Sequence, residues 1–180
     1  MCLISRPAFD KARSFGIYED SLRRLIHLFK YDKMRPLARP LAGHMAAVLP
    51  QLGVIDLCVP VPLFRWRQWK RGFNQSELLA VELCRTAGIQ LGGGVLQRVK
   101  ATESQAGLSN RARLANVAGA FAVRKPDVVN GRRVLVIDDV MTTGATLEAC
   151  AKTLKKAGAG YVAALTIARA KRRIIDVRGM

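Results

Sequence analysis

Long hydrophobic runs are missing from this sequence of 180 residues, although half of them are apolar. No run approaches the ~18–20 residues that a membrane-spanning helix needs, so we expect no transmembrane segment. The first ten residues do not show the organisation of a signal peptide, and the chain has no internal repeat or low-complexity segment. A chain of this length suits one domain with a sizeable core and a small appended lobe.

Cysteine is scarce, and no two cysteines have the C-x-x-C spacing of a zinc or redox site. The four cysteines are Cys2, Cys58, Cys84 and Cys150. The last three lie within apolar patterns, which predicts that they are core residues. His27 and His44 have no partner at metal-ligand spacing, so we interpret both as structural. These observations argue against a cysteine-based metal site and favour a reducing, cytoplasmic location.

Acidic residues are few, because 13 aspartates and glutamates face 30 lysines and arginines, giving a net charge of +17. Such a charge favours anionic partners, which include nucleotides, pyrophosphate esters and nucleic acids. It does not choose among them, and a solvated basic tail explains part of the charge equally well.

The most informative segment covers residues 134–146 and reads VLVIDDVMTTGAT. Its four apolar residues, Val134 to Ile137, predict a buried strand of a parallel sheet. The carboxylates of Asp138 and Asp139 follow directly. Because ligands of open parallel sheets bind beyond the carboxyl ends of the strands, we expect both acids to line a cleft.

The rest of this segment is a short turn, Thr142–Thr146, which contains three threonines and one glycine. A helical pattern follows from residue 145 to 157 and ends at Gly158. Free N–H groups at the start of a helix bind anions, so the segment predicts a site for a phosphorylated sugar. The alternative is that Asp139 or a threonine only caps the helix.

Other periodic segments indicate strands that alternate with helices. We expect helices at 22–31, 37–48 and 76–87, and strands at 54–61, 119–123 and 161–168. This order predicts an α/β fold with a Rossmann-like parallel sheet flanked by helices. We assign residues 1–50 to an N-terminal helical segment or hood, and residues 51–180 to the α/β core.

A second landmark follows the first expected strand and reads PVPLFRWRQWKRGFNQ over residues 60–75. Its basic residues alternate with Trp66, Trp69 and Phe73. That composition suits an anion-binding loop, a platform for single-stranded nucleic acid, or an ordinary surface loop with buried aromatics. Its position after the carboxyl end of a strand favours the ligand-binding loop.

The third landmark is a polar, poorly periodic stretch at about residues 98–116, which predicts a mobile flap leading into a short helix. Loops above an α/β cleft often close on the substrate and exclude water. A plain connection is the alternative interpretation.

All three landmarks resemble one protein family. Residues 134–146 match, at every position, the thirteen-residue phosphoribosyl-pyrophosphate signature of the type I phosphoribosyltransferases. The Pro-Val-Pro and Arg-Gly-Phe-Asn-Gln groups of residues 60–75 resemble the ComF/GntX-like branch, which is linked to competence and DNA uptake. So does the pattern R-x-K-x-T-x-x-Q-x-x-L from Arg98, followed by Arg113, Asn116 and Phe121. The resemblance covers roughly residues 18–168 and implies the type I phosphoribosyltransferase fold with a small hood and flap.

The resemblance also implies roles for individual residues. Asp138 and Asp139 would hold the ribose hydroxyls and act in catalysis with Lys100. The 5′-phosphate would be bound by Thr142, Thr143, Gly144, Ala145 and Thr146. Pyrophosphate would face Arg71 and Gly72 first, then Arg65 and Arg98. Lys100, Thr102 and Gln105 would lie on the flap, where Lys100 or Arg98 neutralises the departing pyrophosphate.

By the same resemblance the ligand is phosphoribosyl pyrophosphate with Mg²⁺. Asp138 and Asp139 are the only protein groups that we expect to contact the Mg²⁺ ion. The implied reaction transfers phosphoribose to an unidentified acceptor and releases pyrophosphate. Two alternatives stay open: a non-catalytic competence factor that binds single-stranded DNA, and a regulator that senses phosphoribosyl pyrophosphate. A homodimer is a further expected assembly.

Three departures from relatives narrow these expectations. Only Cys2 precedes the Tyr18 region, so we expect no four-cysteine zinc ribbon of the kind that many ComF-like proteins carry. Thr142 stands where purine-salvage members have an aspartate base, which argues against hypoxanthine-guanine salvage. No glutaminase nucleophile domain precedes the signature in this sequence, so we do not expect a complete glutamine amidophosphoribosyltransferase.

Overall fold

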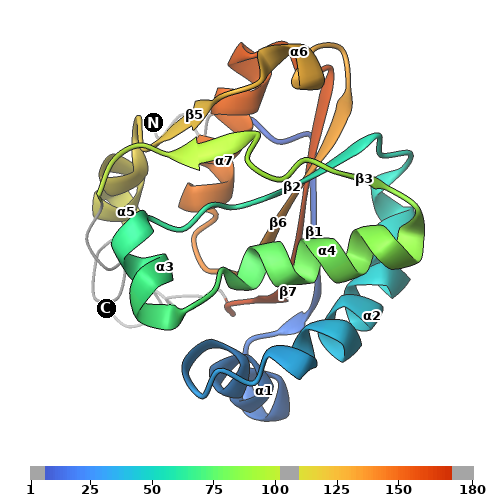
Figure 1. Cartoon of the computed structure of the whole chain (residues 1–180), viewed down its shortest axis with the longest axis vertical. Coiled ribbons are helices and arrows are strands. Elements are labelled where there is room, and N and C mark those ends of the chain that lie inside the picture. Colours follow the sequence, from blue (N-terminus) through green and yellow to red (C-terminus); the bar gives the residue numbers. More distant parts are fainter. Residues whose placement is uncertain (1–6, 102–109, 172–180) are drawn as a thin grey trace, which may run out of the picture.

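A five-stranded parallel sheet, in the order β1-β7-β6-β2-β3, forms the centre of the computed structural model, which describes residues 7–101 and 110–171 (Figure 1). Its strands are β1 (Lys11–Ile17), β2 (Leu57–Pro60), β3 (Gln90–Leu91), β6 (Arg133–Met141) and β7 (Tyr161–Arg169). Every neighbouring pair in this sheet is parallel. The Rossmann-like sheet predicted from the sequence is therefore confirmed.

Helices cover both faces of the sheet, and the strand side chains alternate between them. Leu135 and Ile137 of β6 pack into a core with α1 (Asp20–Tyr31), α2 (Ala38–Val48) and α4 (Gln75–Ala87). Val134 and Val136 point the other way, into a core with α7 (Ala145–Lys156). Because both faces are covered, the apolar run in β6 needs no polar side, as expected for a buried parallel strand.

The predicted helices are confirmed to within about two residues at each end. Two prolines flank α2 in short 3₁₀ turns, Pro36 in Arg35–Leu37 before it and Pro50 in Leu49–Leu52 after it. Proline fits the first turn of such segments because its missing N–H would have no intrahelical partner there.

Strand β2 is shorter than the predicted range of 54–61. Val54 is 73% exposed, and its carbonyl accepts a hydrogen bond from the Arg133 side chain. Asp56 likewise bonds the backbone N–H of Arg133 through its carboxylate. These residues are held by side-chain contacts at the start of β6, so the ladder begins only at Leu57.

A second, two-stranded sheet pairs β4 (Leu96–Arg98) with β5 (Phe121–Val123) in antiparallel fashion. The strand expected at 119–123 thus exists but does not join the main sheet. Helices α5 (Asn110–Val117) and α6 (Pro126–Val129) complete this region, and α5 is the short helix expected at the end of the flap. The flap residues Thr102 and Gln105 lie outside the described residues.

Strand β1 was not predicted, and it lies within the first 50 residues that we assigned to a helical hood. It forms the sheet edge beside β7, where the hydroxyls of Ser14 and Thr166 lie 2.7 Å apart. Its side chains alternate between exposed and partly buried, and polar residues interrupt the apolar ones. An edge strand of this composition gives only a weak sequence signal. The domain boundary near residue 50 stays a prediction.

Cys58, Cys84 and Cys150 are buried, as predicted. His27 makes a ring contact with Tyr31, and His44 stacks on Phe15. Over residues 7–101 and 110–171, no group of three or more His, Cys, Asp or Glu side chains gathers as a metal site. In the same ranges, no helix combines the length and apolar character that crossing a bilayer requires.

Candidate functional site

Both acids of the central motif lie inside the last part of β6, rather than beyond its end. The strand continues to Met141 because β7 is equally long and keeps the ladder paired as far as Arg169. Side chains alternate along a strand, so Asp139 turns to the face of Ile137, which α1 covers. The expected cleft is therefore built partly by a helix that lies far away in sequence.

Asp139 is only 8% exposed and forms an ion pair with Lys30 of α1, with the lysine Nζ 2.8 Å from Oδ1. Burial lowers the pKa of Lys30. The charge of Asp139 and its hydrogen bond, helped by Asp138, more than offset this and hold the pKa of Lys30 above its ordinary value. Lys30 is therefore a charged ammonium beside the two carboxylates.

Asp138 accepts two hydrogen bonds through Oδ1, one from the hydroxyl of Ser76 and one from the backbone N–H of Asp139, both 2.9 Å long. Burial, followed by the charge of Asp139, raises the pKa of Asp138 to about 7, although Lys30 and these hydrogen bonds act in the opposite direction. Two neighbouring carboxylates in a shielded place resist joint ionisation.

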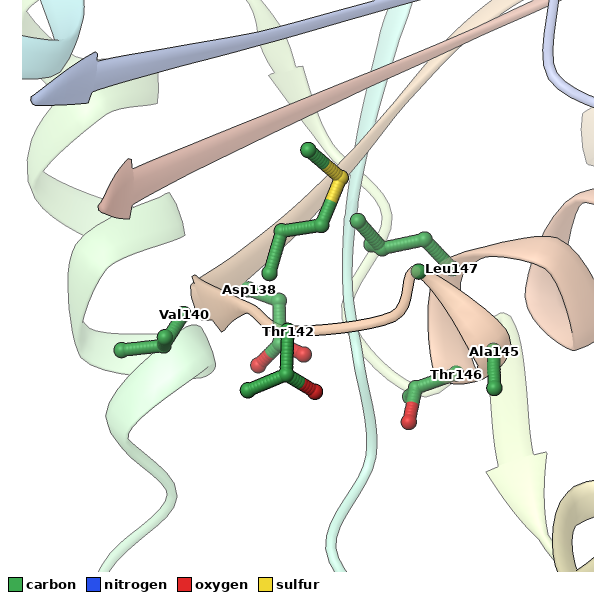
Figure 2. A pocket seen from close by; sticks show the side chains of 8 residues that line it. Asp138, Val140, Thr142, Ala145, Thr146 and Leu147 are labelled. Atoms are coloured by element: carbon green, nitrogen blue, oxygen red, sulfur yellow. The ribbon is translucent and has the colours of Figure 1, made fainter. Parts of the chain in front are cut away.

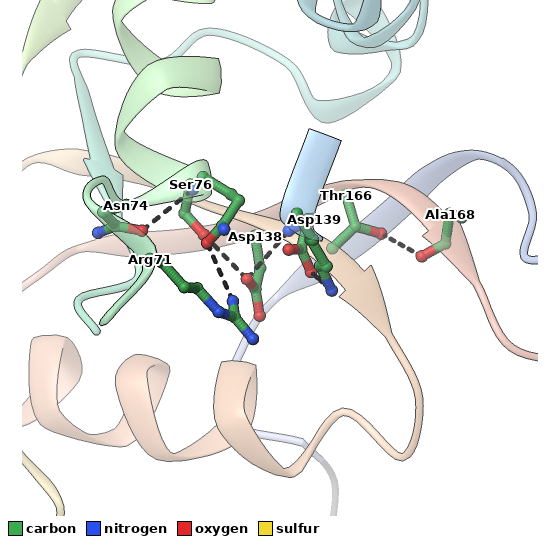
Figure 3. A network of polar contacts seen from close by, with 9 residues as sticks. Arg71, Asn74, Ser76, Asp138, Asp139, Thr166 and Ala168 are labelled. Carbon is green, nitrogen blue, oxygen red and sulfur yellow. Dashed lines mark hydrogen bonds and ion pairs between the residues drawn. The ribbon is translucent and has the colours of Figure 1, made fainter. Parts of the chain in front are cut away.

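The N-terminus of α4 supplies Ser76 and is fixed beside the end of β2. Asn74 caps the helix, since its side-chain oxygen accepts from Ser76 N and its amide donates to the Val61 carbonyl, both at 3.1 Å. The cap aims the Ser76 hydroxyl at Asp138, as Figure 3 shows.

The segment predicted as a loop after β2 contains a short helix, α3 (Arg65–Arg71), which ends at Gly72. Its residues have good helix propensity, and the left-handed conformation of Gly72 stops the helix. The Arg71 guanidinium donates to Gln75 Oε1 at 3.1 Å and lies 5.5 Å from the centre of the Tyr31 ring. Arg65, the other basic residue expected to face pyrophosphate in this segment, is the first residue of α3.

The turn from Thr142 to Gly144 joins β6 to α7, as expected. Gly144 has a φ of +81° and precedes the first helical residue, while Thr143 Oγ1 accepts a 3.4 Å hydrogen bond from Ala145 N. A hollow opens here, and its lining residues are Asp138, Val140, Met141, Thr142, Gly144, Ala145, Thr146 and Leu147 (Figure 2). The structure thus brings the first acid and the expected phosphate loop to one place.

Arg98 and Lys100 lie at and just beyond the end of β4, in the region of the two-stranded antiparallel sheet. Arg98 ends β4, is largely buried, and has its guanidinium 5.4 Å from the centre of the Phe121 ring. It lines a second cavity of about 240 Å³, which Asn74 and Pro62 border from the side of α4 and β2. Lys100 is exposed two residues further along.

Lys30 and Ser76 are the site residues that sequence reasoning missed. Lys30 is one of several basic residues between the apolar positions of α1, so it did not stand out in the sequence. A signal was nevertheless present, because Lys30 follows the buried Ile26 by four residues and therefore lies on its face of the helix. Ser76 occupies the first turn of α4 and gave no signal beyond a helix start.

Comparison with known proteins identifies the family of the chain. The family described as the phosphoribosyl transferase domain matches residues 38–179. The chain therefore belongs to the phosphoribosyl transferase domain family, and its fold is the type I phosphoribosyltransferase α/β fold.

Within this family the chain lies in the ComF-like branch. It is 40% identical over 177 residues to competence protein F of Haemophilus influenzae, covering 94% of this chain and 77% of that protein. It is 35% identical over 167 residues to the DNA utilization protein YhgH of Escherichia coli strain K12, covering 89% and 73%. Competence protein ComFC of Bacillus subtilis is 29% identical over 165 residues, with coverage of 87% and 63%.

Two solved structures also resemble the chain. One is an allosteric regulatory enzyme of purine biosynthesis, 24% identical with a TM-score of 0.48, matched over 72% of this chain and 25% of that one. The other is glutamine phosphoribosylpyrophosphate amidotransferase from B. subtilis, 24% identical with a TM-score of 0.49, matched over 72% and 26%. The chain spans about a quarter of each of these larger proteins.

Proposed function

We propose that the chain binds Mg²⁺-phosphoribosyl pyrophosphate and transfers its phosphoribosyl group to an acceptor, releasing pyrophosphate. The observation that carries this proposal is the position of Asp138. It lines the hollow of the turn before α7, and it is also hydrogen-bonded to Ser76 at the start of α4. A ligand contacting Asp138 therefore has an anion-binding helix start on one side and the α3–α4 connection on the other.

In this proposal the two halves of the ligand are held separately. Carboxylate oxygens of Asp138 and Asp139 accept hydrogen bonds from the ribose hydroxyls. Backbone N–H groups and hydroxyls of residues 142–146 bind the 5′-phosphate. Arg71, at the end of α3, faces the pyrophosphate, because a guanidinium binds phosphate oxygens in a bidentate manner.

The reaction is a displacement at the anomeric carbon of ribose. The bond from this carbon to the pyrophosphate oxygen breaks, and the acceptor's electron pair forms the new bond. Positive charge that develops on the ribose is stabilised by the carboxylate of Asp139. Charge on the departing pyrophosphate is stabilised by Arg71, with Lys100 on the flap as a further candidate. This is electrostatic catalysis by fixed groups.

The donor atoms near Asp138 fit Mg²⁺ only as an ion that the ligand also holds. Asp139 is already paired with Lys30, and the described residues supply no third acid or histidine at this place. Mg²⁺ commonly binds through one or two carboxylates, substrate phosphates and water, which agrees with this donor set. When bound, it would neutralise charge on the pyrophosphate.

Titration calorimetry with phosphoribosyl pyrophosphate and Mg²⁺ tests the binding step. Pyrophosphate release across a panel of amine and base acceptors then tests the transfer step. Pyrophosphate release that occurs only with a particular acceptor would support the proposed transferase activity. Binding without release for any acceptor would favour a sensor of phosphoribosyl pyrophosphate instead.

A second candidate function is binding of single-stranded DNA, which two exposed aromatic side chains favour. Trp66 and Trp69 are 53% and 86% exposed on α3, among basic residues of the same helix. Exposed aromatics among basic residues form stacking platforms for bases. All three relatives described above are also named for competence or DNA utilization.

Salt dependence separates this candidate from general attraction to a basic protein. An oligonucleotide held only by charge loses affinity steeply with salt, and Trp69→Ala leaves its affinity unchanged. If bases stack on α3, Trp69→Ala weakens binding about tenfold at every salt concentration, on the order of one stacked base. Thr86→Val, at an exposed position of α4, is the control.

A further inference from the structure

The C-terminal end of α1 reaches both halves of the site through two consecutive residues. Lys30 pairs with Asp139 at 2.8 Å, on the ribose side. Tyr31 lies under the guanidinium of Arg71, on the proposed pyrophosphate side. Helix α1 precedes residue 38, where the family match begins. The site is thus completed by a helix that lies outside the residues matched to the phosphoribosyl transferase domain.

The ion pair is unusual because both partners are shielded from water. The Lys30 side chain is 17% exposed and that of Asp139 is 11% exposed. A buried charge that loses its partner is strongly unfavourable, so the two side chains fix one another's position. Phe29 and Ile26, which are fully buried, anchor the helix turn that presents Lys30.

The charges near Lys30 explain why a cation is needed there. Asp138 and Asp139 are adjacent in β6, and the ligand of the proposed function is itself a multiple anion. Lys30 offsets the negative charge of Asp139. Asp138 instead accepts hydrogen bonds from the Ser76 hydroxyl and from the backbone N–H of Asp139. Without this ammonium, the two adjacent carboxylates would repel each other, and Asp139 would lose the group that fixes its position.

We propose that Lys30 is a positioning residue of the ribose subsite, which holds the Asp139 carboxylate in the orientation and charge state that ribose hydroxyls require. The proposal rests on the proposed function, since it assigns Lys30 to the same ligand. It predicts an effect confined to ligands that carry ribose, because the Lys30 ammonium contacts Asp139 and not the pyrophosphate side.

Calorimetry with two ligands tests this directly, using phosphoribosyl pyrophosphate with Mg²⁺ and inorganic pyrophosphate with Mg²⁺. Lys30→Met is expected to weaken the first ligand about 20-fold and the second less than about twofold, in line with the loss of a buried charge partner. Arg24→Met removes a positive charge from an exposed position of the same helix and is expected to change neither affinity. Lys30→Gln is the second variant, should Lys30→Met fail to fold.

A double-mutant cycle in ligand-free protein tests the contact itself. Lys30→Met is expected to lower the melting temperature of the wild-type chain but to change that of Asp139→Asn much less, because the partner charge is already gone. Additive shifts would overturn the proposal. Equal losses for both ligands would overturn it too, since they would indicate a general structural defect.

The outcomes also separate this proposal from the proposed function. If wild-type protein binds no phosphoribosyl pyrophosphate, the proposed function fails and the role of Lys30 fails with it, whatever the melting temperatures show. If wild-type protein binds the ligand and Lys30→Met binds it equally well, only the role of Lys30 is wrong.

Discussion

The two sides of the candidate site are built in opposite ways. One side is a continuous segment, Asp138 to Thr146, in which strand, turn and helix start follow one another in the sequence. The other side gathers Lys30, Arg71 and Ser76 from three helices that the chain forms separately. The continuous side carries both acids and the anion-binding helix start, whereas the gathered side brings cations and a hydroxyl to them. The difference shows that a sequence motif can identify the position of a site without identifying the residues from other segments that set its charge.

Among single substitutions, the largest effect is expected at Gly144 of the continuous side, whose φ of +81° is strained for any residue with a Cβ atom. Gly144→Ala should distort the turn and weaken ribose 5-phosphate binding about 30-fold, on the order of one or two hydrogen bonds to a charged group. Gly88→Ala is the matched control, because Gly88 also has a positive φ but ends α4 on the side away from Ser76. Equal loss of affinity in both variants would mean that strain alone, and not the turn, weakens binding.

A smaller effect is expected on the gathered side at Arg71. Arg71→Met removes the guanidinium near Tyr31 and Gln75 and should weaken pyrophosphate binding about tenfold, the scale of a charged hydrogen bond. Ribose 5-phosphate, measured in the same calorimetric series, should be almost unaffected. Arg85→Met, at an exposed ion pair near the end of α4, controls for net charge. Weaker binding of both ligands to Arg71→Met would contradict the division into two sides.

The link between the two sides is the hydroxyl of Ser76, and its loss should have a modest effect. Ser76→Ala leaves Asp138 with one donor fewer, which raises the pKa of Asp138 further and disfavours the carboxylate. We expect affinity for phosphoribosyl pyrophosphate to fall about fivefold at pH 7, the worth of one hydrogen bond. Thr86→Val removes a hydroxyl from an exposed position of the same helix and should change nothing. Unchanged affinity in Ser76→Ala would show that α4 does not contribute to ligand binding through Ser76.

A further effect concerns stability against pH rather than ligand affinity. In the unfolded chain the carboxyl of Asp138 has an ordinary pKa near 4, whereas in the folded chain its pKa is raised to about 7. The folded state therefore binds more protons between these values, and the contribution of Asp138 to stability falls as pH rises from about 4 to about 7. Asp138→Asn should reduce this fall by roughly 2 kcal/mol, measured as the difference between the free energies of urea unfolding at pH 5 and at pH 7.5. An equal change of unfolding free energy with pH in both proteins would show that Asp138 does not titrate between pH 5 and pH 7.5.

Much of the continuous side could be predicted from sequence because its signals are local. An apolar run followed by acids, hydroxyls, glycine and a helical period determines its own backbone, so β6, the turn and α7 were found close to their true bounds. The error there was the length of β6, which depends on how far β7 continues beside it.

The gathered side could not be predicted to the same extent, because its contacts join residues far apart in the chain. The spacing from Ile26 places Lys30 on the buried face of α1, but it does not show that the lysine faces an aspartate 109 positions later. Strand β1 was missed for a related reason, since an edge strand is defined by its neighbour and not by an apolar run. Helix α3 was missed because its alternating basic and aromatic residues suit a loop and a short helix alike.

The most direct test of the central claim is calorimetric titration of phosphoribosyl pyrophosphate with Mg²⁺ into the wild-type chain and into the Asp138→Asn, Asp139→Asn double variant. We predict saturable binding to the wild type, and a loss of at least about 100-fold in the variant, whose melting temperature shows that it is folded. The loss follows because neutral amides accept hydrogen bonds from ribose hydroxyls more weakly than carboxylates do and carry no negative charge. Binding of equal affinity to both proteins would contradict the account.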